Sequence, residues 1–179
     1  MIILIGGNTH TGKTNLAQTI LERYQYPYLS IDHLKMGLIR SGYSDMSVED
    51  DDRITATVWP IIVEMIKTTI ENRQNMVVEG CYIPYDWKNS FEEEYLEHIR
   101  SIYLVMSADY IRNCFEDIMQ YASVIEDRGE DMCWTMEDLI RDNEQVLKAA
   151  KAHGCNYVLI DKKYDMDYIM DALGNIMKK

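Results

Sequence analysis

Residues 7–14 form the segment whose residue types and spacing most clearly indicate chemistry. They fit G-x-x-x-x-G-K-[ST], a pattern in which glycines let the backbone approach a ligand and loop N–H groups surround phosphate oxygens. Lys13 is predicted to reach the β- and γ-phosphates and act in catalysis, and Thr14 to ligate Mg²⁺, whereas His10 is expected to have no catalytic role. The predicted nucleotide-binding residues are Gly7, Asn8, Thr9, His10, Thr11, Gly12, Lys13, Thr14 and Asn15.

Two carboxylates follow short apolar runs from which they could face this loop. Asp32 follows residues 28–31, and Glu79 follows residues 76–78. Phosphoryl transfer uses oxygen ligands for Mg²⁺ and gains from a carboxylate that orients or deprotonates the attacking hydroxyl. We predict that Asp32 is this catalytic, substrate-binding acid and that Glu79 lies near Mg²⁺ and the substrate. The roles could be exchanged, and Asp32 could instead be only a helix N-cap, or Glu79 only a surface carboxylate.

Apolar runs alternate along the chain with longer segments of helical periodicity. This alternation predicts an α/β fold with a parallel sheet covered by helices on both faces, and ligands of such sheets bind beyond the carboxyl ends of the strands. Strands are predicted at residues 1–5, 26–31, 76–79, 101–106 and 156–160. Helices are predicted at residues 15–24, 33–40, 47–72, 108–126, 136–153 and 165–177.

Three residues are expected to shape the ends and the course of the longer helices. Ser47, with Asp50 three residues later, resembles a capping box and is expected to begin the helix at 47–72. Pro60 lies inside that helix and is expected to kink or split it. Gly154 is expected to end the helix that precedes it.

The composition and length limit the partners, the location and the number of domains that we expect. The 179 residues carry a formal net charge of −12, and the sequence pI is about 4.7. Nucleic acids and anionic membranes require a basic surface, so neither is expected as a partner. The absence of a long apolar run or signal peptide predicts a cytoplasmic protein, and the length suits one domain, residues 1–179, as a monomer or a homodimer. Free thiols are predicted for Cys81, Cys114, Cys133 and Cys155.

Three segments together resemble the small P-loop kinases of the nucleoside and nucleotide kinase fold. They read G-G-N-T-H-T-G-K-T, S-I-D-H-L-K-M-G-L-I-R and V-V-E-G-C-Y-I-P, and the E-G-x-x-x-P pattern of the last is similar to 2-phosphoglycerate kinases. The resemblance implies a three-layer fold with a five-stranded parallel sheet in the order 2-3-1-4-5. It also implies Mg·ATP as phosphoryl donor, a small-molecule acceptor, a helical substrate-binding region at residues 33–74 and a small lid at residues 126–135.

The same resemblance implies roles for individual residues. Asp32 matches the substrate-side acid, Glu79 matches the acid of the third strand, and Arg40 lies in the substrate-binding helix. Lids of such kinases carry arginines that neutralise the transferring phosphoryl group. The candidates here are Arg112, Arg128 and Arg141, of which Arg128 is predicted to be catalytic.

The sequence leaves the acceptor open. Tyr82, Tyr85 and Trp87 could contact it or could pack on neighbouring helices, and Tyr82 is the predicted substrate contact. A phosphorylated acceptor needs several cations, and few lie in this region, so a neutral hydroxyl acceptor and a phosphate ester are both retained. The cations that could converge on the acceptor are Lys35, Arg40 and Arg53.

Two other functions remain as alternatives to a kinase. One is a P-loop NTP hydrolase or switch, and the other is a nucleotide-binding regulatory protein without an acceptor. A GTPase would show N-K-x-D after a late strand, but residues 158–163 read V-L-I-D-K-K. We therefore predict an ATP-dependent kinase that transfers the γ-phosphoryl group of Mg·ATP to a hydroxyl or phosphate of a small molecule.

Overall fold

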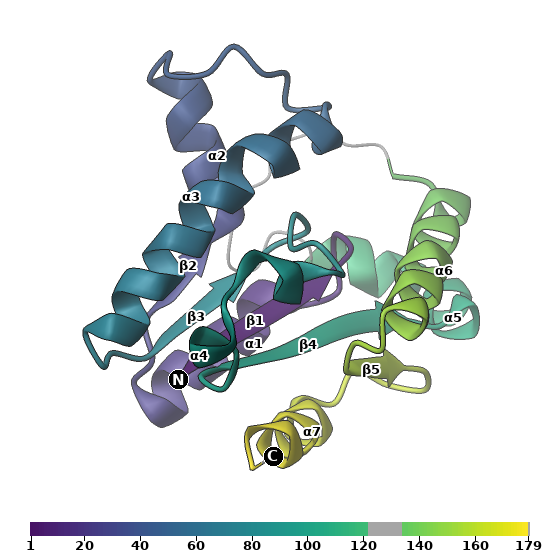
Figure 1. The fold of residues 1–179 in the computed structure, drawn as a ribbon. Coiled ribbons are helices and arrows are strands. Elements are labelled where there is room, and N and C mark those ends of the chain that lie inside the picture. Colours follow the sequence, from purple (N-terminus) through teal and green to yellow (C-terminus); the bar gives the residue numbers. More distant parts are fainter. Residues whose placement is uncertain (122–133, 179) are drawn as a thin grey trace.

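A computed structural model describes residues 1–121 and 134–178 of the chain (Figure 1). Its strands are β1 (Ile2–Gly7), β2 (Tyr28–Ser30), β3 (Met76–Glu79), β4 (Ile99–Met106) and β5 (Tyr157–Ile160). Its helices are α1 (Lys13–Tyr24), α2 (Ile31–Arg40), α3 (Asp51–Glu71), the 3₁₀ helix η1 (Trp87–Ser90), α4 (Glu93–Leu96), α5 (Ala108–Tyr121), α6 (Met136–Ala152) and α7 (Met166–Met177).

The five strands form one sheet in the order β2-β3-β1-β4-β5, and every neighbouring pair is parallel. Both the α/β class and the predicted strand order are confirmed. All six residues of β1, the central strand, are buried. Because the strands are parallel, their carboxyl ends meet at one edge of the sheet.

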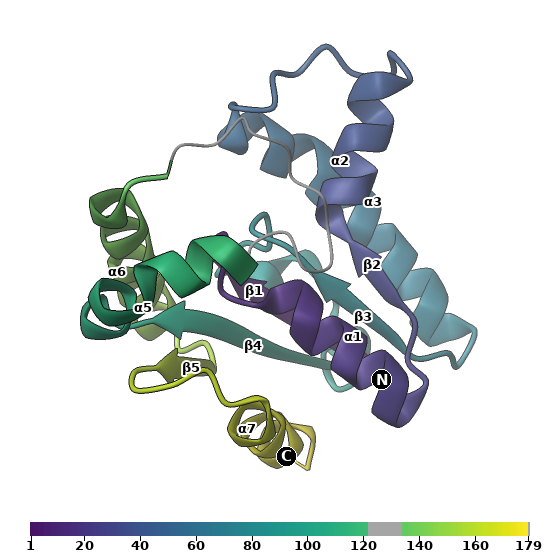
Figure 2. The ribbon, with the colours of Figure 1, turned by 180° about the vertical axis from the view of Figure 1, so that it is seen from behind.

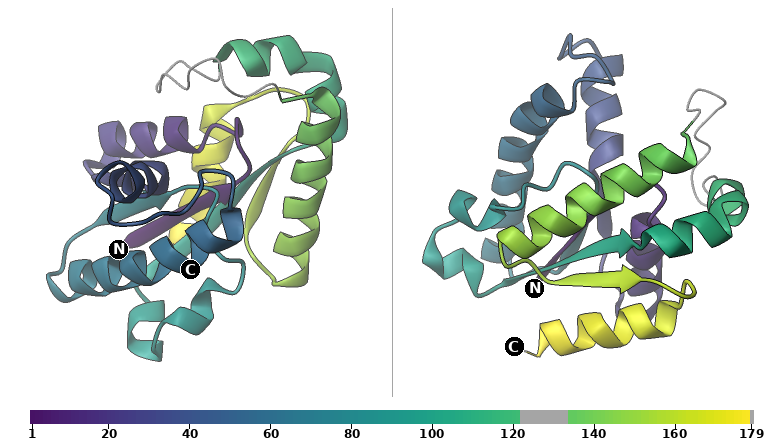
Figure 3. Two further views of the ribbon diagram at one scale, coloured as in Figure 1. Left: turned by 90° about the horizontal axis from the view of Figure 1, so that it is seen from above. Right: turned by 90° about the vertical axis from the view of Figure 1, so that its right-hand side faces the viewer.

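Two hydrophobic clusters, one on each face of the sheet, hold the layers together. Ile2 and Leu4 of β1 join the cluster that contains the buried residues of α3. Ile3 and Ile5, which alternate with them, join the cluster that contains residues of α1, α5 and α7. Figures 1 and 2, which view the molecule from opposite sides, show α3 in front of the sheet in one and α1 in front in the other, and Figure 3 shows the sheet between them.

The start of α3 differs from the prediction. Ser47 does not begin this helix; Asp50 is its N-cap, and the Asp50 side chain accepts a hydrogen bond from Arg53 N. Residues 47–50 form a separate turn, in which Asp50 N donates to the Ser47 carbonyl oxygen. An aspartate at the N-cap followed by Asp51 and Asp52 in the first turn also suits the helix dipole, so this start is the more stable one.

Pro60 was predicted to kink or split α3, and the split is wrong, because α3 continues through Pro60 as one helix. Proline removes the hydrogen bond that its N–H would donate to the carbonyl oxygen of Ala56. Pro60 and Ala56 are both exposed, so this carbonyl can be hydrated at the solvent-facing side of the helix. The buried face, which includes Ile54, Val58 and Ile62, is unbroken.

The segment between β3 and β4 contains two short helices, η1 and α4, that were not predicted. Trp87 is 3% exposed, and its ring meets Phe91 at 6.2 Å between centroids. Phe91 in turn packs edge-on against Trp59 of α3, whose Nε1 donates to Ser90 Oγ over 2.9 Å. Trp87 therefore packs into the core, which is one of the two roles considered for it.

Other predictions are confirmed within the described residues, and some lie outside them. Gly154 follows α6 with a φ of +63°, as expected of a residue that ends a helix. Cys81, Cys114 and Cys155 are free. Cys133 and Arg128 lie outside the described residues, as does all of the predicted lid at 126–135 except Trp134 and Thr135. In the described ranges, no helix is long and apolar enough to cross a membrane.

The close packing of β1 against β4 gives a test of the fold. A Cβ at Gly6 would lie 2.4 Å from Cε1 of Tyr103, which is 2% exposed and donates its hydroxyl to Pro84 O over 3.0 Å. Because this ring cannot move freely, we expect Gly6→Ala to lower the free energy of unfolding by about 1–3 kcal/mol.

The matched control is Gly174→Ala in α7, where a Cβ would meet no atom within 4 Å. This variant should be more stable than the original chain, by roughly 0.5–1 kcal/mol, because alanine favours a helix. Urea unfolding followed by circular dichroism measures both changes. Equal stability of the two variants would contradict the packing described for Gly6.

Candidate functional site

The loop between β1 and α1 has a backbone conformation that requires glycine at both motif positions. Gly7 has a φ of +134° and Gly12 a φ of +83°. A Cβ at Gly7 would lie 2.4 Å from the carbonyl oxygen of Leu104, and a Cβ at Gly12 would lie 2.3 Å from the hydroxyl of Tyr164. The loop is therefore packed between β4 and the segment that follows β5, and α1 begins directly after Gly12.

Lys13 lies inside this loop, with 5% of the residue exposed. Its Nζ donates to the carbonyl oxygen of Asn8 over 2.6 Å, and Thr11 Oγ1 donates to the same oxygen over 2.8 Å. The loop thus surrounds a buried ammonium group, as the sequence pattern predicts for a phosphate site.

Asn8 provides a test of whether the loop fits an anion. Its Oδ1 accepts a hydrogen bond from Thr9 N over 2.7 Å. Its Nδ2 is buried and has no hydrogen-bond partner among the described residues. A buried donor without a partner costs free energy, and a phosphate oxygen at the loop would satisfy it. The donors of this loop therefore fit the phosphates of a nucleotide.

Thr14 and Glu79 lie together beside the loop. Thr14 Oγ1 donates to Glu79 Oε1 over 3.4 Å, and Glu79 is 2% exposed, so Glu79 is not a surface carboxylate. Residues 1–121 and 134–178 contain no group of three or more His, Cys, Asp or Glu side chains arranged to hold a metal ion. Mg²⁺ in nucleotide sites commonly takes one or two protein oxygens and completes its shell with phosphates and water, so this pair fits it.

Strand register brings the predicted site residues to one edge of the sheet. Ser30, the last residue of β2, pairs with Glu79 of β3, and Glu79 pairs on its other side with Ile5 of β1. Asp32 and Gly7 each follow this level by two residues. The predicted catalytic acid, the predicted metal ligand and the phosphate loop therefore start from adjacent strand ends.

Asp32 belongs to a compact cluster with Lys35 and Tyr82, which we call the Asp32 cluster. Lys35 Nζ donates to Asp32 Oδ1 over 2.6 Å and to the hydroxyl of Tyr82 over 3.2 Å. The ammonium also lies over the Tyr82 ring, 5.0 Å from its centroid. Asp32 is not the N-cap of α2, because that position is Ser30. The Asp32 side chain is 33% exposed, so a ligand can reach it.

Burial and hydrogen bonding fix the protonation of this cluster. Burial raises the pKa of Tyr82 to about 12, so its hydroxyl keeps its proton at neutral pH. For Lys35, burial acts to lower the pKa, but the hydrogen bonds with Asp32 and Tyr82 outweigh it, and the pKa is raised. The cluster therefore combines a charged ammonium, a carboxylate and a phenol that can donate.

The predicted arginines of the described residues are separate from the Asp32 cluster or paired with carboxylates of their own helices. Arg40 is exposed at the last residue of α2, and eight residues of helix separate it from Asp32, which is about 12 Å along the axis. Arg112 of α5 pairs with Asp109 over 3.0 Å. Arg128 lies outside the described residues. Arg40 is therefore not part of the Asp32 cluster.

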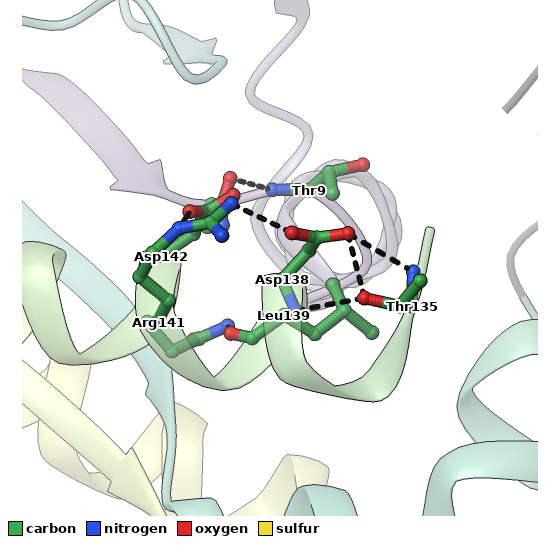
Figure 4. A network of polar contacts seen from close by, with 8 residues as sticks. Thr9, Thr135, Asp138, Leu139, Arg141 and Asp142 are labelled. Atoms are coloured by element: carbon green, nitrogen blue, oxygen red, sulfur yellow. Dashed lines mark hydrogen bonds and ion pairs between the residues drawn. The ribbon is translucent and has the colours of Figure 1, made fainter. Parts of the chain in front are cut away.

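Arg141 lies in the first turns of α6, close to the phosphate loop. It forms ion pairs with Asp138 over 2.8 Å and with Asp142 over 3.2 Å. Asp138 also forms a capping box with Thr135 at the start of the helix. Figure 4 shows Thr9 of the phosphate loop in the same network of polar contacts. Of the predicted lid arginines, Arg141 is thus linked to the loop through this network.

Sequence reasoning missed Tyr164, which supports the phosphate loop from the segment after β5. Its hydroxyl donates to the carbonyl oxygen of Gly12 over 3.3 Å. No motif marks Tyr164; the one available signal was its place just beyond a strand end at the ligand-binding edge.

The architecture is that of the P-loop kinases. A proposed kinase from Chloroflexus aurantiacus J-10-fl is 21% identical with a TM-score of 0.57, over 98% of this chain and 97% of that one. A gluconokinase from Sinorhizobium meliloti 1021 is 14% identical with a TM-score of 0.53, over 98% and 91%. A deoxyadenosine kinase from M. mycoides is 16% identical with a TM-score of 0.57, over 98% and 100%.

These similarities establish the fold, a three-layer α/β P-loop fold of the nucleotide kinase type, and confirm the resemblance seen in the sequence. Neither a protein-family model nor a curated protein matches the chain. The neighbours are named for different acceptors, so the fold by itself does not select one.

The contact between Tyr164 and Gly12 predicts a role in nucleotide affinity. We expect Tyr164→Phe to weaken nucleotide binding about fivefold, because a hydrogen bond of about 1 kcal/mol that holds the loop is lost. Titration calorimetry with Mg·ATP measures this change. The control is Tyr168→Phe on α7, where the tyrosine is 60% exposed. Equal affinities of the two variants would show that the Tyr164 hydroxyl does not order the loop.

Buried tyrosines also predict a fall in stability at alkaline pH. Burial raises the pKa of Tyr82, Tyr85 and Tyr164 to about 12. Above a pH of about 10 these groups ionise in the unfolded chain before they ionise in the folded one, so the free energy of unfolding should fall from pH 10 towards 12. Urea unfolding at several pH values measures the slope. Tyr164→Phe should reduce it, and an unchanged slope would contradict this assignment.

Proposed function

We propose that this chain is a small-molecule kinase that transfers the γ-phosphoryl group of Mg·ATP to an acceptor hydroxyl. The observation that supports this most is the presence of two polar centres at one edge of the sheet. One is the phosphate loop around Lys13, which follows β1. The other is the Asp32 cluster, whose residues follow β2 and β3 at the same edge of the sheet. A nucleotide hydrolase needs the first centre, whereas a kinase needs both.

In the proposed reaction, the loop N–H groups and Lys13 hold the β- and γ-phosphates. Lys13 exchanges its bond to the Asn8 carbonyl oxygen for phosphate oxygens. Asp32 accepts the proton of the acceptor hydroxyl, since only one of its oxygens is engaged by Lys35. The acceptor oxygen forms a bond to the γ-phosphorus, the bond from this phosphorus to the β,γ-bridging oxygen breaks, and ADP leaves.

Thr14 and Glu79 are the residues proposed to hold Mg²⁺. When bound, this ion would reduce the negative charge of the phosphates. An arginine is expected to neutralise the transferring group, and Arg128 is the residue we propose, with Arg112 and Arg141 as alternatives. Residues 126–135 are the proposed lid. Its closure over the site would exclude water and favour phosphoryl transfer over hydrolysis. A cytoplasmic location and a single domain remain part of this proposal.

The first test is turnover. Purified protein with Mg·ATP is mixed with pools of nucleosides, nucleoside monophosphates, sugars, sugar acids and phosphoglycerates, and ADP release is compared with a sample that contains no acceptor. We expect release that depends on an acceptor. Release that is the same without any acceptor would instead indicate an NTP hydrolase, and binding of ATP without any release would indicate a regulatory protein.

The second test is Lys13→Ala. Because one group that stabilises the transferring phosphoryl is removed, we expect acceptor-dependent turnover to fall by about a hundredfold or more, with the fold retained by circular dichroism. Lys148→Ala, at an exposed position of α6, is the control and should keep full activity. Full activity of Lys13→Ala would exclude the phosphate-loop assignment.

The third test separates Asp32 from the metal. Asp32→Asn should lower kcat by about 10²–10⁴-fold, the range of a general base, while Mg·ATP binding changes little. Asp171→Asn, at an exposed position of α7, is the control. An equal loss of ATP binding and turnover in Asp32→Asn would move this carboxylate to the metal site.

A further inference from the structure

The charge around the Asp32 cluster identifies the class of acceptor. Lys35 is its only cation, and this ammonium is already 2.6 Å from the carboxylate of Asp32. Burial raises the pKa of Tyr82, and the negative charge of Asp51 at the start of α3 adds to this in the same direction. The phenol of Tyr82 contributes no charge. The described groups facing the acceptor therefore carry no surplus positive charge.

The other cations of this region are neutralised or distant. Residues 32–74 contain eight carboxylates and five Lys or Arg side chains. Arg53 is paired with Asp45, and Lys67 is paired with Glu64 and Glu92. Arg40 ends α2, about 12 Å along the helix from Asp32, and Arg73 lies beyond the far end of α3, which is about 30 Å long.

A phosphate or carboxylate on the acceptor would be poorly bound in these surroundings. It would have to take Lys35 from Asp32, and it would leave the carboxylate that the reaction needs beside another negative charge. A second carboxylate, Asp51, would add to this repulsion. Sites for phosphate esters usually combine several unpaired cations or backbone donors, which the Asp32 cluster does not supply.

Neutral hydroxyl groups match the same residues well. The Asp32 carboxylate accepts strongly from a hydroxyl donor. The Tyr82 hydroxyl accepts a hydrogen bond from Lys35. It retains its own proton, which it can donate to a second hydroxyl oxygen of the substrate. A molecule with several hydroxyl groups can therefore bind to Asp32 and Tyr82 at once.

We propose that the acceptor is an uncharged compound with several hydroxyl groups, of the kind of a nucleoside or a sugar, and that Lys35 positions Asp32 instead of binding an anionic group. This rests on the proposed kinase function and differs from the phosphorylated acid that the similarity to 2-phosphoglycerate kinases would imply. It narrows the two acceptor classes that the sequence left open to one.

Matched acceptor pairs test the proposal with the intact chain. Each pair differs by an anionic group: a nucleoside and its 5′-monophosphate, glucose and gluconate, glycerol and glycerol 3-phosphate. With Mg·ATP, we expect kcat/KM for at least one neutral member to exceed that of its anionic counterpart by tenfold or more, and the pair in which this occurs distinguishes a nucleoside from a sugar.

The outcomes separate this inference from the proposed function. A tenfold preference for an anionic member, or equal use of both members, would overturn the neutral acceptor and leave the kinase standing. ADP release that never depends on an acceptor would overturn the kinase, and the neutral acceptor with it.

Lys35→Met tests the positioning role. If Lys35 orients Asp32, kcat for the neutral acceptor should fall at least tenfold while its KM changes less than threefold, and Lys35→Arg should recover part of kcat. A rise in KM with kcat unchanged would mean that Lys35 binds the acceptor itself and would overturn this role.

Asp51→Asn tests the repulsion independently of Lys35. Removal of this negative charge should raise kcat/KM for the anionic member of each pair several-fold relative to the neutral one. Asp171→Asn, far along the chain on α7, is the control and should leave the ratio unchanged. An unchanged ratio in Asp51→Asn would show that Asp51 does not select against anions.

Discussion

The close approach of β1 to β4 is the constraint on which the site depends. Gly6 pairs with Tyr103 and Gly7 with Leu104, and neither glycine has room for a side chain. This packing fixes the point at which the chain leaves the sheet and enters the phosphate loop. On its other side β1 pairs with β3. Because Ile5 pairs with Glu79, the register of these two strands also fixes the position of Glu79 along the sheet. The positions of the phosphate loop and the buried acid are consequences of one strand paired on both sides.

The loop itself is supported by residues from distant parts of the chain. Leu104 of β4 packs against Gly7, and Tyr164 packs against Gly12. Glu79 accepts a hydrogen bond from the hydroxyl of Thr14. The polar network of α6 reaches Thr9. The eight-residue motif therefore has its conformation only when the sheet and the helices on both of its faces are in place. This explains why a phosphate loop is read easily in sequence but depends on tertiary structure for its geometry.

Much of this arrangement could be predicted from the sequence. The alternation of short apolar runs with segments of helical periodicity predicted the α/β class. The resemblance to small P-loop kinases implied the strand order. The errors have local causes. Asp50 competed with Ser47 as N-cap, and the sequence did not show that 47–50 would form its own turn. Pro60 was expected to kink or split α3, and the helix is not split. The exposed position of Pro60 lowers the cost of the lost hydrogen bond, and exposure is a property of the packed structure.

Contacts between distant segments could not be predicted. Tyr164 meets Gly12 across more than 150 residues, a separation that no local pattern encodes. Lys35 and Tyr82 are also far apart in sequence, and the sequence alone indicates only that Lys35 could converge on the acceptor with Arg40 and Arg53. Its ion pair with Asp32 reverses that interpretation, because a charge that is already matched cannot attract a second anion at no cost.

The two polar centres therefore handle charge in different ways within one acidic protein. The phosphate loop holds Lys13 against a neutral carbonyl oxygen, so its positive charge is available to an anion, and the net charge of −12 does not prevent this. In the Asp32 cluster, Lys35 donates to a carboxylate, so the positive charge of Lys35 is neutralised within the protein. The phosphate loop therefore suits Mg·ATP, which carries several negative charges, and the Asp32 cluster suits an uncharged substrate. Lys13 and Lys35 differ in their hydrogen-bond partners and not in their own chemistry.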